Sequence, residues 1–506
     1  LQAYRYPALV AVITDYVDMA PGRTIDYGYR PFGRDDFVTW AQLKQMHDSG
    51  LIEVASHTDD LHHGVLANPQ GNSTPAVVTR IYSPATHSYE TEAQYEQRLR
   101  TDLARSVQRI EQHLGVRPRA IVWPYAAYNQ LSNDIAEQLG MPVSFDLEGR
   151  STPVASDLHG LARFLVSDNP TVEGLAYELR RDVALDGIRA LQIDLDDVYD
   201  ADPAQQARNL DALVERVKRI APTHVYLQAF ADPDGNNTAD ALYFPNRHMP
   251  MRADLFSRVA WQLKSRAGVK VYAWLPVLGF ELPDPAQRKA LAIRNGDADG
   301  MYRLDFTNPK ARQIMLDIYE DLAVNSYFEG LLFHDDGYLR DTELPALAAG
   351  GDGSARTQAL ISFTLALRDS AQRWRPKLAT VRNLYAEPVL RPQSEAWFAQ
   401  RLDLFNKAYD QTALMAMPWM EGSKHPERWL DQLLAAVRTH DPQLQHTLFE
   451  LQTVDWRNGQ PIPAERLRAQ IRQLQAQGVH HFAWYPDDFI ADQPSTRDAR
   501  AAMSAG

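Results

Sequence analysis

The sequence predicts an α/β protein with two domains, the second of which is a (β/α)8 barrel. The chain has 506 residues, which is more than one hydrophobic core usually holds. From about residue 185 onward, short apolar strands alternate regularly with helical stretches, and eight such units follow one another. Several of these strands end in clusters of acidic or aromatic residues, as expected at the catalytic rim of a parallel barrel.

The barrel is predicted over residues 185–506, with helical patterns between its strands, for instance at 203–219, 252–266, 309–324 and 426–439. The eight predicted strands are Arg189–Leu195, His224–Phe230, Val269–Leu275, Gly330–Phe333, Leu378–Asn383, Thr412–Met417, Thr447–Leu451 and His481–Tyr485. Parallel strands carry their carboxyl ends to one mouth. We therefore expect the sequences DLDDVYD, ADPDGNN, HDDGYLRD and PDDF, which follow four of these strands, to meet there.

Residues 1–180 are predicted to form the first domain, in which strands and helices also mix. Tyr6–Ile13 and Leu51–Ala55 have the apolar pattern of strands, and Asp36–Ser49 and Gln94–Leu114 have helical spacing. Two further strand-then-loop segments are expected at residues 144–149 and 161–170. A helix at Pro170–Arg181 would lead into the barrel.

Composition narrows the class of protein. Hydrophobic residues make up 45% and charged residues 23% of the chain, as in ordinary globular proteins. We find no apolar run near 18 residues, the length a membrane-spanning helix needs. The absence of Cys excludes disulfides and Cys-based zinc or nucleophile sites. A net charge of -13 argues against a nucleic-acid partner and favours a neutral or cationic one.

The strand Gly330–Phe333 stops abruptly at His334, Asp335 and Asp336, and Asp341 follows shortly after. Crowded carboxylates can be driven to different pKa values, so that one stays protonated while another stays ionised. An aspartate after a strand can also simply cap a helix. Two adjacent aspartates together with His334 favour a functional site.

The sequence SHTDDLHHG follows the strand Leu51–Ala55 and holds His57 and His62. Five residues is the wrong spacing for one helix face, but a strand end and its loop can direct both imidazoles to one ion. A polar surface loop without a ligand is an equally good interpretation of these residues alone.

Three motifs of the first domain, SHTDDLH, WPYAAYN (123–129) and FDLEG, resemble the polysaccharide deacetylases of the NodB-homology class. Their combination with a barrel carrying FHDDGYLRD resembles the poly-β-1,6-N-acetyl-D-glucosamine N-deacetylases, the PgaB family. The resemblance spans essentially the whole chain. It implies a NodB-type (β/α) barrel, with its first strand missing, followed by a glycoside hydrolase domain.

The resemblance implies a divalent metal in the deacetylase domain, either zinc, nickel, cobalt or iron, with His57 and His62 as ligands. Tyr125 would offer its backbone N–H to the oxyanion. The family's paired aspartates, a third ligand and a catalytic base, are expected just before Leu1, so this domain is expected to be truncated at its N-terminus. Arg163 stands where the class usually has a further His.

In the barrel, the resemblance implies a glycosidase without a cofactor. Asp335, Asp341 and Glu450 are the candidate catalytic carboxyl groups, which can work in pairs. The candidate substrate-binding residues are Asp336, His334, Trp274, Trp419, Trp484 and Tyr338, with Trp456 as a further aromatic face. Core packing is the alternative for the tryptophans, and Glu450 could instead be a buried, paired carboxylate.

The expected function is partial de-N-acetylation of poly-β-1,6-N-acetyl-D-glucosamine, with binding and internal cleavage of the deacetylated polymer, during exopolysaccharide export in biofilms. The resemblance further implies a periplasmic, outer-membrane-anchored protein and a possible outer-membrane porin as partner. A C-terminal domain that only binds and guides the polymer is one alternative. An unrelated amylase-like or chitinase-like hydrolase is another, from fold analogy alone.

Overall fold

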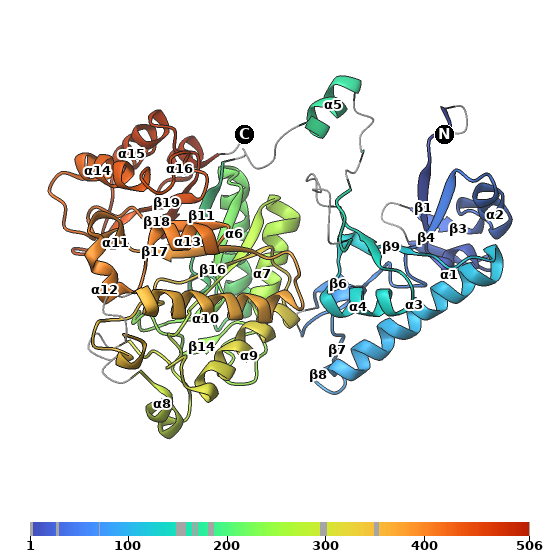
Figure 1. Cartoon of the computed structure of the whole chain (residues 1–506), viewed down its shortest axis with the longest axis horizontal. Coiled ribbons are helices and arrows are strands. Elements are labelled where there is room, and N and C mark those ends of the chain that lie inside the picture. Colours follow the sequence, from blue (N-terminus) through green and yellow to red (C-terminus); the bar gives the residue numbers. More distant parts are fainter. Residues whose placement is uncertain are drawn as a thin grey trace. The chain divides into compact units, whose positions relative to one another are not determined.

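A computed structural model of the chain describes residues 4–26, 30–69, 71–147, 158–163, 166, 171–180, 187–293, 301–348 and 354–504. It divides into two compact units, Leu1–Leu185 and Asp186–Gly506 (Figure 1). Each unit is built on a parallel sheet of its own. No helix in the described part of the chain has both the length and the hydropathy to cross a membrane.

The sheet of the first unit has four described strands, all parallel. In spatial order they are β1 (Ala8–Val12), β4 (Ile52–Ser56), β9 (Ala120–Val122) and β10 (Val143–Phe145). The first two confirm the strands predicted at residues 6–13 and 51–55. Of the loops expected after residues 144 and 161, positions 148–149, 164–165 and 167–170 lie outside the described residues.

Two helices predicted for the first unit are present as α2 (Trp40–Asp48) and α3 (Glu92–Leu114). The side chain of Thr91 accepts a hydrogen bond from the Gln94 backbone, which caps the start of α3. Gly115 ends this helix in the left-handed conformation, with φ 77°. The helix predicted at residues 170–181 is present as α5 (Val172–Arg180).

The second unit is a closed barrel of eight parallel strands, as predicted. In order around the barrel they are β11 (Arg189–Ile193), β12 (His224–Gln228), β15 (Lys270–Leu275), β16 (Gly330–Phe333), β17 (Ala379–Leu384), β18 (Gln411–Met415), β19 (Thr447–Gln452) and β22 (Phe482–Tyr485). Each overlaps a strand predicted from sequence. Because all eight run in one direction, their carboxyl ends share one mouth.

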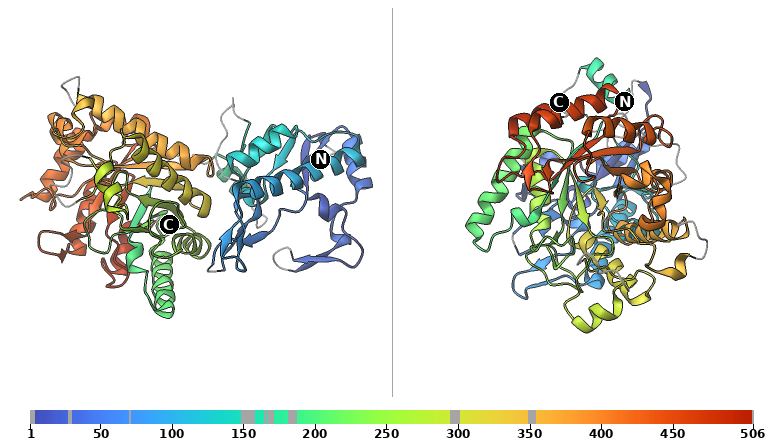
Figure 2. Two further views of the ribbon diagram at one scale, coloured as in Figure 1. Left: turned by 90° about the horizontal axis from the view of Figure 1, so that it is seen from below. Right: turned by 90° about the vertical axis from the view of Figure 1, so that its left-hand side faces the viewer.

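Helices surround these strands, as the two views of Figure 2 show. The longer ones are α6 (Pro203–Ile220), α9 (Pro309–Asn325), α10 (Ser354–Gln372), α14 (Pro426–Val437) and α15 (Ala464–Ala476). Both α6 and α9 begin with Pro directly after a capping side chain, Asp202 or Asn308. This pairing of a cap with a proline suits a short loop that enters a helix sharply.

We predict that residues 186–506 fold alone, since a (β/α)8 barrel is self-sufficient. Thermal unfolding of this fragment, followed by circular dichroism, should match the barrel transition of the whole chain within about 3 °C, roughly 1 kcal/mol. Aggregation or early melting of the fragment, beside a stable whole chain, would mean that the two units share a core.

Candidate active sites

A cavity of about 460 Å³ opens at the mouth of the barrel. Its lining comes from all eight strands or the loops that follow them. Among the lining residues are Asp194, Asp196, Asp197, Gln228, Phe230, Asp232, Trp274, His334, Asp335, Asn383, Met415, Met417, Met420, Glu450, Trp456 and Tyr485. Six of these side chains are carboxyl groups and none is Lys or Arg, so the cavity favours a cation or a polar neutral ligand.

Asp335 lines this cavity, two residues beyond the end of β16 and directly after His334. The Tyr385 hydroxyl donates a hydrogen bond to its Oδ2 at 3.1 Å. His334 Nε2 lies 3.1 Å from its Oδ1. The Asp335 side chain keeps 19% of its surface exposed, which is enough for a ligand to reach it.

Asp336 points the other way, as expected for neighbours in an extended backbone. It is fully buried, and its carboxylate accepts hydrogen bonds of 2.6–2.8 Å from the backbone N–H groups of Val277, Leu278 and Gly279. Those residues directly follow Pro276, beyond the end of β15. The prediction that Asp336 binds substrate is therefore wrong: its carboxylate holds the neighbouring loop.

Arg382 of β17 fixes the same turn from the other side. Its buried guanidinium donates to the backbone carbonyls of Phe333, His334 and Gly337, the first at 3.2 Å. A Cβ at Gly337 would lie 2.1 Å from the Arg382 Nη2 atom, so a larger residue there would displace the guanidinium. The backbone that carries Asp335 is thus held by β15 and β17 together.

Glu450 of β19 faces the cavity from another part of the barrel. It lies beside Met415 in the strand register and is only 2% exposed. Asn383 Nδ2 donates to its Oε2 at 2.7 Å. Burial, with the nearby charge of Asp335, raises the pKa of Glu450 to about 8. At neutral pH it is mainly a neutral carboxylic acid.

Four aspartates that were not predicted individually form one side of the cavity: Asp194, Asp196, Asp197 and Asp232. They follow β11 and β12, where the acidic sequences DLDDVYD and ADPDGNN had indicated a cluster. Burial raises the pKa of Asp194 to about 8 and that of Asp197 to about 6. The Tyr485 hydroxyl donates to Asp194 at 3.3 Å.

Four Phe, Trp and Tyr side chains line the cavity: Phe230, Trp274, Trp456 and Tyr485. The rings of Trp456 and Tyr485 stack with centroids 6.2 Å apart, and Trp456 is 44% exposed. Trp274 is almost fully buried and meets Tyr485 edge-on at 5.3 Å. Trp456 therefore presents the accessible flat face, while Trp274 shapes the floor.

Besides Asp336, four of the predicted barrel-site residues lie outside this lining. Trp484 is 1% exposed and donates its indole N–H to Asp487. Trp419 packs with Ile462 in a hydrophobic cluster. These two predictions are corrected to core packing.

The other two residues outside the lining are Tyr338 and Asp341. The ring of Tyr338 lies under the Arg303 guanidinium, 4.3 Å from its Cζ, and beside Tyr385. Asp341 is exposed and is not among the residues that line the cavity. Neither side chain lines the cavity, so the predictions that Tyr338 binds substrate there and that Asp341 is catalytic there are corrected.

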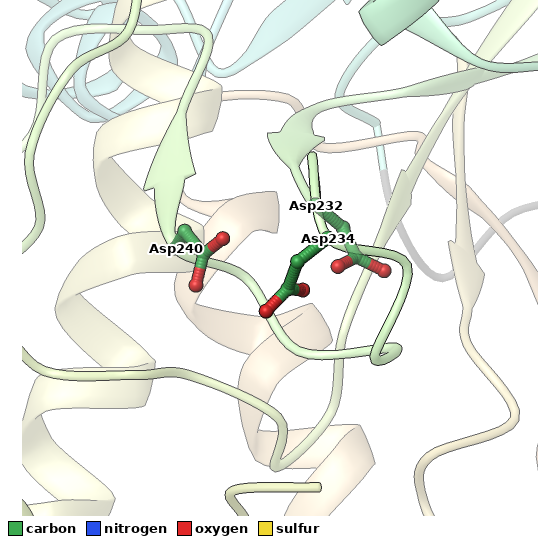
Figure 3. Close-up of side chains that lie close together, drawn as sticks. All are labelled: Asp232, Asp234 and Asp240. Atoms are coloured by element: carbon green, nitrogen blue, oxygen red, sulfur yellow. The ribbon is translucent and has the colours of Figure 1, made fainter. Parts of the chain in front are cut away.

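Asp232, Asp234 and Asp240 gather on the chain after β12 (Figure 3). One oxygen of each lies within 4.8 Å of the others, a spacing that could hold a divalent cation. The carboxylate of Asp232 also accepts hydrogen bonds from the backbone N–H groups of Asn236 and Asn237. Exposed acidic groups often lie this close without an ion, so the arrangement alone does not identify a metal site.

In the first unit, the structure brings His57 and His62 together with ring centroids 5.0 Å apart. His57 Nδ1 is bonded to the Val122 carbonyl, which leaves Nε2 as its ligand atom. Burial lowers the pKa of His57 to about 4 and also lowers that of His62. Neutral imidazoles fit a divalent metal. Within the described residues, no third His, Asp or Glu completes a close group with them.

Helix α3 anchors the loop between these two histidines. The Asp102 carboxylate accepts hydrogen bonds from the backbone N–H groups of Asp59 and Asp60, at 2.9 and 2.8 Å. The buried Asp59 side chain in turn accepts bonds from Thr14 and Arg109. These contacts fix the turn that folds the two imidazoles toward each other.

Tyr125 and Arg163 lie next to the two histidines. The Tyr125 ring packs on His62 with centroids 4.4 Å apart, in a backbone with φ 55°. Arg163 Nε donates to the Asp146 carbonyl, and its charge contributes to lowering the pKa of His57. Both residues therefore surround the candidate metal ligands.

The chain matches two family models. Residues 1–144 match Polysaccharide deacetylase, and residues 192–350 and 353–485 match Hypothetical glycosyl hydrolase family 13. Together these matches span both structural units. The order of the two activities along the chain is the order expected from the motifs.

Known relatives agree with these matches. Poly-beta-1,6-N-acetyl-D-glucosamine N-deacetylase of Escherichia coli (strain K12) is 37% identical over 98% of this chain and 78% of its own length. The enzyme of the same name from Staphylococcus aureus (strain MSSA476) is 25% identical over 33% of this chain and 48% of its own length. The solved PgaB (BpsB) glycoside hydrolase domain from Bordetella bronchiseptica is 46% identical, with TM-score 0.60, over 63% of this chain and 99% of that domain. The chain belongs to the poly-β-1,6-N-acetyl-D-glucosamine N-deacetylase family and is a carbohydrate hydrolase with a polysaccharide deacetylase domain and a glycoside hydrolase domain.

Proposed function

We propose that the first domain removes acetyl groups from poly-β-1,6-N-acetyl-D-glucosamine and that the barrel binds and cuts the partly deacetylated polymer. The name of the Escherichia coli relative, which aligns with 98% of this chain, supports this substrate. The observation that carries the barrel's part is the cavity at its mouth, with six carboxyl groups and an exposed tryptophan. Deacetylation creates ammonium groups, and such a cavity favours them.

For the first domain, we propose that His57 and His62 hold a divalent ion: zinc, nickel, cobalt or iron. When bound, the ion would polarise the acetamide carbonyl and lower the pKa of a water. The turn at Tyr125 would place a backbone N–H near the oxyanion, and its ring would cover one side of the site. Arg163 would lie at the same edge, beside His57.

For the barrel, we propose Asp335 as the central catalytic carboxyl group. It is rigidly held and reachable, and its hydrogen bond from Tyr385 orients it in the cavity. Glu450 is the second carboxyl group and, with its raised pKa, acts as a hydrogen-bond donor at neutral pH. Trp456 and the underlying Tyr485 would stack against a sugar ring.

A barrel that only binds and guides the polymer toward export is the second candidate. The exposed position of Asp341 favours it, since one of the three candidate catalytic carboxyl groups is lost from the cavity. In either case we propose a periplasmic protein anchored to the outer membrane, with an outer-membrane porin as possible partner. The cavity's negative charge argues against nucleic acid.

The metal proposal predicts that the protein binds a divalent ion and that His57→Ala or His62→Ala weakens the affinity at least about tenfold. His63→Ala is the matched control. The His63 side chain is exposed, directly follows His62 in the sequence and is not a proposed ligand. Isothermal titration with zinc, supported by elemental analysis, measures the affinity. Equal affinities in all three variants would exclude this pair as ligands.

The hydrolase proposal predicts different effects for two adjacent residues. Asp335→Asn should slow cleavage of partly deacetylated polymer at least about 100-fold, with polymer binding and folding largely intact. Asp336→Asn should instead lower the free energy of unfolding by about 3 kcal/mol, because a neutral amide accepts the three buried N–H groups poorly.

Product release from polymer and denaturant unfolding measure these two effects. Cleavage by Asp335→Asn at the wild-type rate would place the site elsewhere. Binding without cleavage by the wild type would favour the guiding module.

The raised pKa of Glu450 predicts a pH effect on stability. Between its ordinary pKa of 4.5 and about 8, the folded state keeps a proton that the unfolded chain loses. The stabilisation of the folded state by this bound proton is complete below pH 4.5 and is lost as the pH rises to about 8. Over this range the free energy of unfolding falls by up to about 1.4 kcal/mol per pH unit. Glu450→Gln should flatten this slope in urea unfolding, whereas the exposed Glu465→Gln should not. Parallel pH curves for wild type and Glu450→Gln would contradict the assignment.

A further inference from the structure

The turn that joins His57 to His62 contains a strained residue. Thr58 is fully buried and has φ 72°, in the left-handed region, which a β-branched side chain rarely adopts. A backbone conformation of this kind persists only where the surrounding structure holds it. The contacts that hold this turn therefore decide whether the two histidines keep their places.

The two histidines are fixed in different ways. His57 directly follows β4, and its ring is bonded to the Val122 carbonyl of β9, so the sheet holds it. His62 lies at the far end of the turn, where the Leu61 backbone N–H donates to the Thr58 hydroxyl at 3.1 Å. The position of the second imidazole relative to the first therefore depends on the shape of the turn.

Four polar side chains of α3 reach this turn or the strand end before it: Asp102, Arg105, Ser106 and Arg109. The last three follow Asp102 by three, four and seven residues, so the four form one stripe along the helix. Asp102 is 9% exposed and Ser106 is fully buried. Buried polar groups are costly without hydrogen bonds, and the turn supplies bonding partners for this stripe.

Asp102 bonds directly to the backbone of the turn. Its two oxygens accept separate hydrogen bonds, from the N–H of Asp59 at 2.9 Å and from that of Asp60 at 2.8 Å. The buried carboxylate of Asp59 in turn lies 2.8 Å from Arg109 and 3.3 Å from Arg105. An amide in place of the Asp102 carboxylate would offer one acceptor oxygen instead of two, and its NH2 group would face a backbone N–H.

Ser106, one turn further along α3, holds the start of the same turn. Its hydroxyl lies 2.8 Å from that of Ser56, the last residue of β4, and the Ser56 hydroxyl accepts the Thr58 N–H at 3.0 Å. The left-handed residue is thus held through its own N–H, and Asp102 holds the next two N–H groups. Helix α3 therefore supplies the constraint that this strained backbone needs.

We propose that Asp102 is a positioning residue of the deacetylase domain, which holds the turn between His57 and His62 so that both imidazoles stay directed toward one divalent ion. It acts through the backbone of Asp59 and Asp60, not as a ligand. Helix α3 holds the histidine pair in place whether or not an ion is bound, so the site is formed in advance. This inference rests on the proposed metal site and adds the group that shapes it.

The test compares Asp102→Asn with wild type in the full chain. The zinc affinity, measured by isothermal titration, should fall at least about tenfold, as is usual when a group that orients metal ligands is lost. In metal-free protein with labelled histidines, the nuclear Overhauser signal between the rings of His57 and His62 should be present in wild type and lost in the variant. Asp48→Asn, at the exposed end of α2, is the matched control and should change neither quantity.

A ring-to-ring signal that survives in Asp102→Asn, or that wild type lacks, would overturn the inference, whatever happens to the free energy of unfolding. A merely structural role would lower that free energy and leave the signal in place. If Asp102→Asn does not fold, Ser106→Ala serves the same comparison, since it removes only the bond to Ser56. If wild type binds no zinc, the metal proposal fails, and the ring-to-ring signal alone decides the inference.

Discussion

The barrel site depends on how one short turn, His334 to Gly337, is held at the end of β16. Asp336 turns inward and accepts three backbone N–H groups from the loop after β15. Arg382 holds three carbonyls of the same stretch from β17. A buried carboxylate and a buried guanidinium are costly unless they are hydrogen-bonded, and here the Asp336 carboxylate and both Nη atoms of Arg382 are bonded to backbone groups. The result is a rigid backbone that leaves Asp335 as the one carboxylate of the turn facing the cavity.

Burial then gives the carboxyl groups of the cavity different properties. Glu450 of β19 and Asp194, which follows β11, both have pKa values raised to about 8. Glu450 is buried beside Asn383 and Met415, and its neutral form persists because burial and the nearby charge of Asp335 raise its pKa. Asp194 lies among other aspartates, and an incoming ammonium group would lower its pKa and restore its charge. Glu450 therefore donates a hydrogen bond at neutral pH, whereas Asp194 can change its charge when a cation binds.

The sequence was sufficient to predict the barrel, because a strand followed by a helix recurs eight times along the second half of the chain. It was also sufficient for the opposite orientations of Asp335 and Asp336, which follow from the period of two along an extended chain. The same rule explains why Trp484 was misassigned. Tyr485 faces the cavity, so its neighbour must face the helices, but strands buried on both sides show no polar alternation that would reveal which is which.

Asp341 was misassigned for a different reason. Its expected return to the cavity depended on the path of the chain after the turn, and local sequence does not determine that path. The acidic sequences after β11 and β12 marked the mouth correctly, but only the closed strand order shows that they face the methionines of β18. Opposition across a barrel involves residues more than 200 positions apart, such as Asp194 and Met417. The pattern within one strand does not show which residues lie across the barrel from it. Only the fold therefore shows that aspartates line one part of the cavity and methionines another.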